Sequence, residues 1–191
     1  LGGFGIAAHP DSPRPSLSWN DWEAPIDGLE WMNGDSGWRD EGSGALARAA
    51  LAYWFRAPGA MATLLDRPVE LLARWDTAGA TRSVIALAAA DAHARLGRRQ
   101  TTDQDGPGLH LPVPGYEVAF RTFSNHVVLT RPLGGDAAAD ADAVLGALTQ
   151  GRSFTVVDAL AAPGELEFTA RSVGGTVAGM GAMRIGALRR R

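Results

Sequence analysis

The chain has 191 residues, of which 46% are hydrophobic and 20% are charged, and its net charge is -3. This composition allows a packed core and excludes general disorder. The small net charge gives no reason to expect nucleic acid or an anionic membrane as a partner, and no run approaches the ~20 apolar residues of a membrane span. Cysteine is absent, so any metal must be held by His, Asp or Glu.

The sequence begins at Leu1, directly before an apolar run of strand character. We therefore interpret it as part of a longer protein in which further sequence, including any signal peptide, precedes Leu1. Localisation and oligomeric state stay open for this reason.

Residues 1–112 alternate predicted strands and helices. The strands are expected at Phe4–Ala8, Ile26–Asn33 and Ser83–Ala90. Continuous apolar character, clearest in the last of these, is typical of strands covered on both faces in a parallel sheet. Helices are expected at Gly42–Phe55 and Met61–Asp76, with a break near Pro68. This order predicts an α/β fold.

Residues 113–191 form the second predicted part, after a Gly/Pro/Asp-rich loop at Gln100–Pro114. One or two strands are expected within Val118–Leu129. An Ala-rich helix is expected at Asp136–Gln150, with Asp136 as its N-cap. Strands at Ser153–Val157 and Glu165–Arg171 follow. This part is expected to be the start of a small β domain.

Candidate metal ligands follow two of the predicted strands. His9 ends the run IAAHP, and Asp91 and His93 lie in LAAADAHA. Active sites of barrel-like α/β folds gather at the carboxyl ends of strands, where loops vary freely, and these donors suit zinc, manganese or iron. Each motif alone is more often a loop residue with a hydrogen bond, but their equivalent positions favour a shared site, with the side chains within roughly 10 Å.

The strand between these motifs supplies candidates for substrate binding. Asn33 and Asp35 stand at its end, where they either bind substrate or form a turn with Gly34. Glu30 lies within the strand, and alternation leaves open whether it faces the pocket or a covering helix.

The segments GFGIAAHPDSP, IDGLEWMN and LAAADAHAR, in that order, resemble the second half of a PHP domain (polymerase and histidinol phosphatase superfamily). That family builds a distorted seven-stranded β/α barrel around up to three metals. His9 matches the family's strand-end His-Pro motif. Glu30 and Asn33 match its Gly-x-Glu-x-x-Asn strand. Asp91 and His93 match its Asp-x-His signature.

The run ALTQGRSFTVVDALAAPGELEFTA is similar to the segment that follows the barrel in CehA/McbA-like metallohydrolases of the PHP type, so the resemblance covers Phe4–Ala170. It implies the second half of a distorted (β/α)7 barrel followed by a small strand-rich segment. It also implies a hydrolase that uses two or three divalent ions (Zn, Mn or Fe) and a metal-activated water on a small-molecule phosphoester, carbamate or other ester. His9, Asp91 and His93 would be metal ligands.

The family's early motifs, which include a His-x-His pair and a bridging acidic residue, are absent from this sequence. No metal then keeps a complete set of ligands, so the chain alone is expected to be inactive although the longer protein is an enzyme. No general acid or base can be assigned. The alternative is a non-catalytic role, as a degenerate barrel or a small-molecule or sugar-binding module in which the strand-end His and Asp only hold loops.

Overall fold

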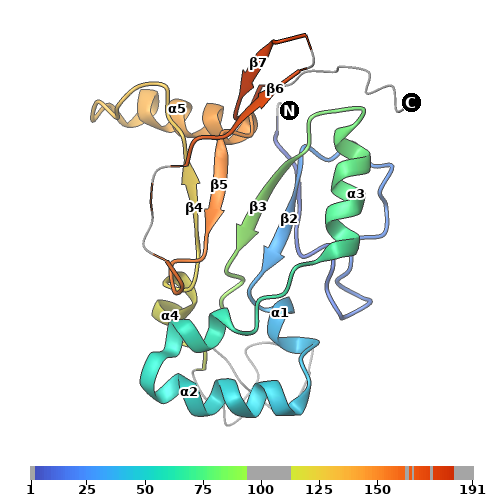
Figure 1. The fold of residues 1–191 in the computed structure, drawn as a ribbon, viewed down its shortest axis with the longest axis vertical. Coiled ribbons are helices and arrows are strands. Elements are labelled where there is room, and N and C mark those ends of the chain that lie inside the picture. The colour runs from blue at the N-terminus through green and yellow to red at the C-terminus, as the bar shows by residue number, and fades with distance from the viewer. Residues whose placement is uncertain (1–2, 94–112, 162–163, 165, 173, 183–191) are drawn as a thin grey trace.

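The computed structural model describes residues 3–93, 113–161, 164, 166–172 and 174–182. Its central element is a parallel sheet of three strands in the order β1-β2-β3. The strands are β1 (Ile6–Ala7), β2 (Gly28–Asn33) and β3 (Ile85–Ala89). In Figure 1, β2 and β3 run side by side toward helices α1 (Ser36–Arg39) and α2 (Ser43–Ala62). The carboxyl ends of the strands therefore lie at one edge of the sheet.

The core of this sheet follows from the apolar runs of its strands. Ala7, Leu29 and Val84 are buried together with Leu71 of helix α3 (Val69–Gly79). Tryptophans surround this cluster, and the indole N–H of Trp75 donates to the Val84 carbonyl at 2.6 Å. The aromatic side chains thus pack the core, which is the commonest role of Trp in a domain of this size.

The helix boundaries differ from the predicted ones around Pro58. Helix α2 continues to Ala62, past the predicted end at Phe55, but its geometry is non-helical at Arg56 (φ -151°, ψ 68°). A proline within a helix lacks the N–H donor and its ring clashes with the preceding turn, which breaks the regular geometry there. The second predicted helix begins only at Val69, directly after Pro68.

The prediction of strand structure across Val118–Leu129 is wrong in its first part. Residues Tyr116–Phe120 form helix α4, and the strand β4 covers Ser124–Val127. Tyr116 and Phe120 stack with ring centroids 6.5 Å apart, as side chains four residues apart do on a helix.

The remaining elements agree in part with the sequence. Helix α5 (Ala137–Thr149) has Asp136 as its N-cap, whose carboxylate accepts from two backbone N–H groups, which confirms that prediction. Strand β5 (Ser153–Val156) pairs antiparallel with β4. The predicted strand Glu165–Arg171 is ordered as β6 only over Thr169–Arg171. It pairs with β7 (Val177–Gly179), a hairpin partner that the sequence analysis missed.

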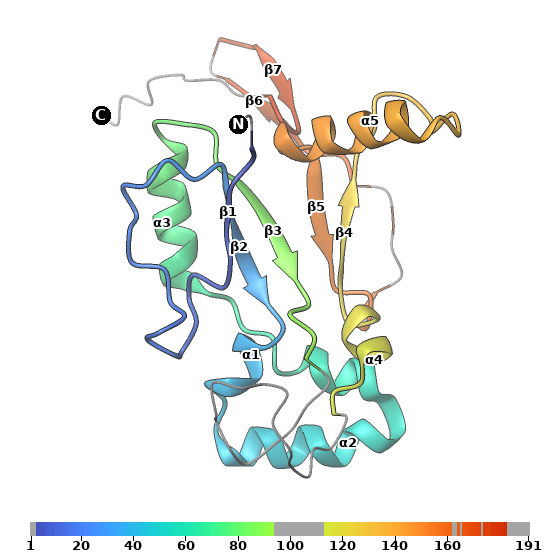
Figure 2. The same cartoon turned by 180° about the vertical axis from the view of Figure 1, so that it is seen from behind.

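The antiparallel pair β4-β5, whose strands are joined through α5, lies beside β3 (Figure 2). The Asn125 side chain donates to the Ala88 carbonyl at 2.7 Å and accepts from the Ala88 N–H at 3.0 Å. β3 is an outer strand of the sheet, and the Asn125 amide pairs with its backbone at Ala88 as a neighbouring strand would. The opposite edge of the sheet is β1, where Ile6 is 38% exposed.

These elements establish a mixed α/β arrangement with a strand-rich second part. The predicted boundary after residue 112 adjoins a stretch outside the described residues, 94–112, which also contains most of the predicted Gln100–Pro114 loop. Among the described helices, none has the length and apolar character needed to cross a membrane.

Candidate metal centre

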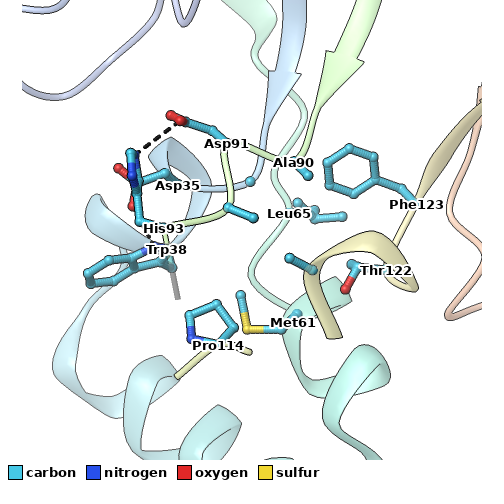
Figure 3. Close-up of a pocket in the computed structure, with 13 residues that line it drawn as sticks. Asp35, Trp38, Met61, Leu65, Ala90, Asp91, His93, Pro114, Thr122 and Phe123 are labelled. Atoms are coloured by element: carbon cyan, nitrogen blue, oxygen red, sulfur yellow. Dashed lines mark hydrogen bonds and ion pairs between the residues drawn. The ribbon is translucent and has the colours of Figure 1, made fainter. Parts of the chain in front are cut away.

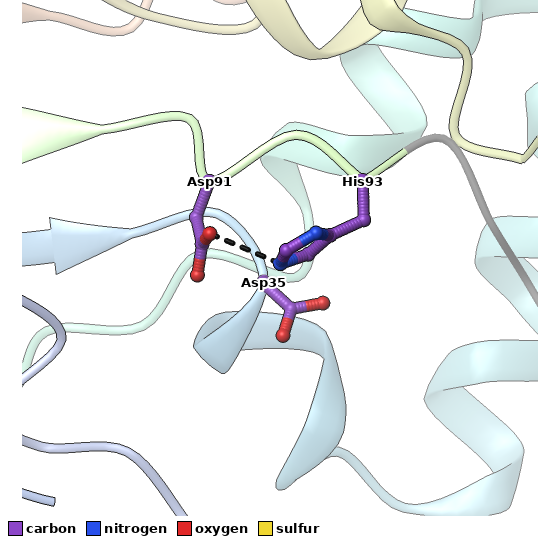
Figure 4. A group of neighbouring side chains, drawn as sticks. All are labelled: Asp35, Asp91 and His93. Carbon is purple, nitrogen blue, oxygen red and sulfur yellow. Dashed lines mark ion pairs between the residues drawn. The ribbon is translucent and has the colours of Figure 1, made fainter. Parts of the chain in front are cut away.

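Three side chains with metal-ligating groups meet at the carboxyl ends of β2 and β3. Ligand atoms of Asp35, Asp91 and His93 all lie within 4.8 Å of one another. In Figure 4, Asp91 and His93 follow β3, while Asp35 approaches from the turn after β2. The pair predicted from the Asp-x-His motif is therefore joined by Asp35, which the sequence suggested only as a substrate-binding residue.

The Asp91–His93 pair is the closest contact in this group. His93 Nε2 lies 3.1 Å from Asp91 Oδ1, and the side chains are 37% and 24% exposed. Asp91 has a φ of 42°, in the left-handed region that residues other than Gly, Asn and Asp rarely adopt. Such backbone conformations cluster at functional sites because the surrounding structure must hold them.

Gly34 allows the turn after β2 to touch the end of β3. Its N–H donates to the Ala89 carbonyl at 2.9 Å. A Cβ at this position would lie 2.6 Å from the Ala90 carbonyl oxygen, far inside a normal contact. The absence of a side chain at Gly34 is what brings Asp35 next to Asp91.

Asp35 is buried and already has two cationic partners. Its Oδ2 accepts from Arg14 Nη2 and from Arg39 Nε, each at 2.6 Å, and its Oδ1 accepts from Arg39 Nη2 at 2.8 Å. The Trp38 indole N–H also donates to Oδ1, at 3.2 Å. Both oxygens are engaged, so a metal ion would have to share them with the guanidinium groups. These arginines were not among the predicted site residues, although the spacing from Asp35 to Arg39 is that of a helical ion pair.

His9 lies outside this group of three, although it ends a strand at the same edge of the sheet. Because β2 separates β1 from β3, and β1 ends level with Ala86, before the end of β3 at Ala89, the two strand ends are more than two strand spacings apart. His9 Nδ1 lies 3.0 Å from the Leu17 carbonyl oxygen. A carbonyl only accepts, so this bond requires a proton on Nδ1 and leaves Nε2 with a free lone pair. Metal-bound histidines commonly have this second contact.

Glu30 and Asn33 are hydrogen-bonded to each other. Glu30 Oε2 accepts from the His9 backbone N–H at 2.7 Å and from Asn33 Nδ2 at 2.9 Å. Asn33 Oδ1 in turn accepts from the N–H groups of Asp35 and Ser36 at 3.0 and 2.9 Å. Asn33 therefore forms the turn that the sequence offered as the alternative to substrate binding.

Two cavities open at this edge of the sheet. The first, about 30 Å³, is lined by Asp35, Asp91 and His93 together with apolar side chains that include Met61 and Phe123 (Figure 3). It has room for about one water. The second, about 220 Å³, is lined by residues from the turn after β1, from β2 and α1, and from the segment before α3, among them His9, Glu30, Asn33 and Arg67. The larger space for a small molecule thus lies on the His9 side.

No protein-family model, no curated protein and no solved structure matches this chain. The interpretation of the site therefore depends on its own geometry and chemistry.

Proposed function

We propose that this edge of the sheet is the metal-binding site of a hydrolase of the PHP type. The observation that carries the proposal is the Asp91–His93 pair, with Asp35 within 4.8 Å, on a left-handed turn at the end of a parallel strand. The resemblance of the sequence to the PHP family adds support from an independent direction. The complete (β/α)7 barrel is part of the same proposal.

The distance between the ligand atoms of Asp91 and His93 suits a small divalent ion. Zinc binds nitrogen and carboxylate oxygen at about 2.0–2.1 Å, so two ligand atoms of one tetrahedral ion lie about 3.3 Å apart, and those of an octahedral ion about 2.9 Å. The observed separation of 3.1 Å between His93 Nε2 and Asp91 Oδ1 lies between these values. Asp35 fits less well, because its oxygens are engaged by Arg14 and Arg39.

His9 would hold a separate ion in this proposal. It lies outside the group of Asp35, Asp91 and His93, whose ligand atoms are within 4.8 Å of one another. This agrees with the family's cluster of two or three divalent ions, in which ligands from different strands serve different metals. When bound, a divalent ion supplies Lewis acidity and lowers the pKa of a water for attack on an ester.

The residues around the ions would bind and orient the substrate. Arg14 and Arg39 carry two positive charges against the single negative charge of Asp35, and their side chains are 32% and 22% exposed. Asp91 adds a second negative charge that balances the arginines, so a bound divalent ion would supply the positive charge that favours an anionic phosphoester over a neutral carbamate.

The test is a titration of the chain with Zn²⁺ and Mn²⁺ by calorimetry. Asp91→Asn keeps the shape of the side chain and removes its charge, so we expect the affinity to fall about tenfold or more with the fold retained. Asp142→Asn changes the net charge equally on an exposed position of α5 and serves as the control. Equal affinity of the Asp91→Asn variant and the wild type would refute ligation. Turnover of p-nitrophenyl phosphate against a p-nitrophenyl carbamate, with Zn²⁺ or Mn²⁺ added, tests the substrate class.

The non-catalytic alternative also has a specific observation in its favour. Asp35 holds two arginines, and His9 holds the Leu17 carbonyl, which are the contacts expected if strand-end residues only fix loops. This alternative expects no binding of Zn²⁺ or Mn²⁺ above that of the Asp91→Asn variant, so the same titration decides between the two.

A further inference from the structure

We infer that Glu30 is a positioning residue whose carboxylate sets both the His9 turn and the Asp35 turn at the carboxyl edge of the sheet. Its role as a metal-site determinant rests on the proposed function, whereas its effect on the two turns does not. The sequence suggested Glu30 as a substrate-binding residue, and the hydrogen bonds described above give it a different task.

Strand β2 contains an irregularity next to Glu30. The pairing of β2 with β3 shifts register between Glu30 and Met32, so that Trp31 is an extra residue in the strand. In a regular strand, residues three apart point to opposite faces. A bulge of one residue reverses this relation, and Asn33 Nδ2 consequently reaches Glu30 Oε2 at 2.9 Å. The bulge thus places a carboxylate and an amide on the same face of β2.

Glu30 holds the His9 turn through the backbone. His9 has a φ of 33°, a conformation that costs about 1–3 kcal/mol for residues other than glycine and persists only when neighbours enforce it. The His9 N–H donates to Glu30 Oε2 at 2.7 Å, a short bond to a charged acceptor of the stronger class. This bond sets the direction of the peptide that carries the imidazole.

Glu30 Oε2 also acts on the Asp35 turn, through its hydrogen bond to the side chain of Asn33. Asn33, which is only 9% exposed, accepts from the N–H groups of Asp35 and Ser36 with its other amide atom. The bond to Glu30 fixes the amide orientation, because Nδ2 must face the carboxylate and Oδ1 must face the turn. Loss of Glu30 would free this amide to rotate and would release the turn before α1.

One carboxylate therefore connects the ends of β1 and β2, and Gly34 connects the end of β2 to that of β3. A direct role of Glu30 as a metal ligand would have to use Oε1, because Oε2 already accepts two hydrogen bonds. Positioning uses Oε2, and it depends on where this acceptor oxygen is rather than on its charge.

The test compares Glu30→Ala with Glu30→Gln in the whole chain, with Glu23→Ala as the control because Glu23 is exposed. The glutamine carbonyl can still accept from His9 and Asn33, but it carries no charge. One measurement is the ¹⁵N-labelled amide signal and the HN–Hα coupling of His9, which report its left-handed turn. The other is titration with CoCl₂, followed by visible absorption.

We expect Glu30→Ala to change the His9 coupling and to weaken Co²⁺ binding by roughly 10–100-fold, as loss of an orienting partner of a metal site does. Glu30→Gln should restore the His9 coupling and bring the affinity to within about threefold of the wild type. Glu23→Ala should leave both unchanged.

An unchanged His9 coupling in Glu30→Ala would overturn the inference, and so would a Glu30→Gln variant as impaired as the alanine variant, since that result would assign the effect to charge. If Glu30→Ala does not fold, Glu30→Gln alone decides by the same two measurements. A wild-type chain that binds no Co²⁺ would contradict the proposed function, while the His9 coupling would still test the positioning.

Discussion

Gly34→Ala is the substitution that most directly tests how the site is assembled. The added Cβ would lie 2.6 Å from the Ala90 carbonyl oxygen and 3.3 Å from the Ala90 carbonyl carbon. The first distance is roughly 0.8 Å shorter than a relaxed contact between carbon and oxygen. The clashing atom belongs to the backbone, so no side-chain rotation can relieve it, and the two strand ends must separate.

The expected cost follows from the structure. Excess volume at a packed position typically costs 1–3 kcal/mol, and separation stretches the hydrogen bond from the Gly34 N–H to the Ala89 carbonyl, worth about 1 kcal/mol. Alanine also lowers the conformational entropy of the unfolded chain, which raises the free energy of unfolding by about 0.4–1 kcal/mol. We therefore expect the free energy of unfolding to fall by about 2 kcal/mol, which lowers the Tm of a chain of this size by roughly 4–8 °C.

The assay is urea and thermal unfolding followed by circular dichroism, with Zn²⁺ titration of the folded protein beside it. Gly79→Ala is the matched control, because a Cβ at this helix position meets nothing within 4 Å; it should be neutral or stabilising by up to about 1 kcal/mol. A Gly34→Ala variant that unfolds at the same urea concentration as the wild type would refute the close approach of the two strand ends. Weaker Zn²⁺ binding should accompany the loss of stability, because the turn carries Asp35 away from Asp91.

Three further substitutions test separate parts of the structure. Asp35→Ala removes the buried acceptor of four hydrogen bonds and leaves two partly exposed guanidinium groups without a counter-charge, so urea unfolding should show a loss of roughly 3 kcal/mol; a loss under about 1 kcal/mol would contradict this. Asn125→Ala exposes the backbone of β3 at Ala88 and should cost about 1–3 kcal/mol, with faster amide hydrogen exchange in β3 as the specific readout. The pKa of Asp140 is lowered by the backbone N–H groups of Gly134 and Gly135 and further by a nearby arginine. Its contribution to stability is therefore present at neutral pH and is lost as the pH falls through about 4 toward the folded-state pKa. The stability difference between the wild type and Asp140→Asn should shrink over that range, and a constant difference between pH 7 and pH 3 would be inconsistent with it.

The sequence alone determined the features that depend on neighbouring residues along the chain. The continuous apolar run before Asp91 predicted a buried strand because both of its faces are covered. Asp136 predicted the start of α5 because its carboxylate satisfies the free N–H groups of the first turn. The same reasoning placed His9, Asp91 and His93 at strand ends, since proline and polar residues end an apolar run.

Local pattern was insufficient where two conformations suit the same residues. One or two strands were expected within Val118–Leu129, yet its first residues belong to helix α4. The first helix was expected to end at Phe55, and a kink at Arg56 follows directly, but helical geometry resumes beyond it as far as Ala62. Tertiary contacts can outweigh preferences of this size, because each is worth only a few kcal/mol.

Only the tertiary structure decided which side chains meet. Asp35 joins Asp91 and His93 because β2 and β3 are parallel neighbours and Gly34 permits their ends to touch. His9 stands apart from them because β1 lies on the far side of β2. Glu30 lines the larger cavity and is also a partner of Asn33, because one extra residue in β2 brings the two side chains to the same face. Strand order, register and close approach depend on residues distant in sequence, and a pattern of near neighbours carries no information on them.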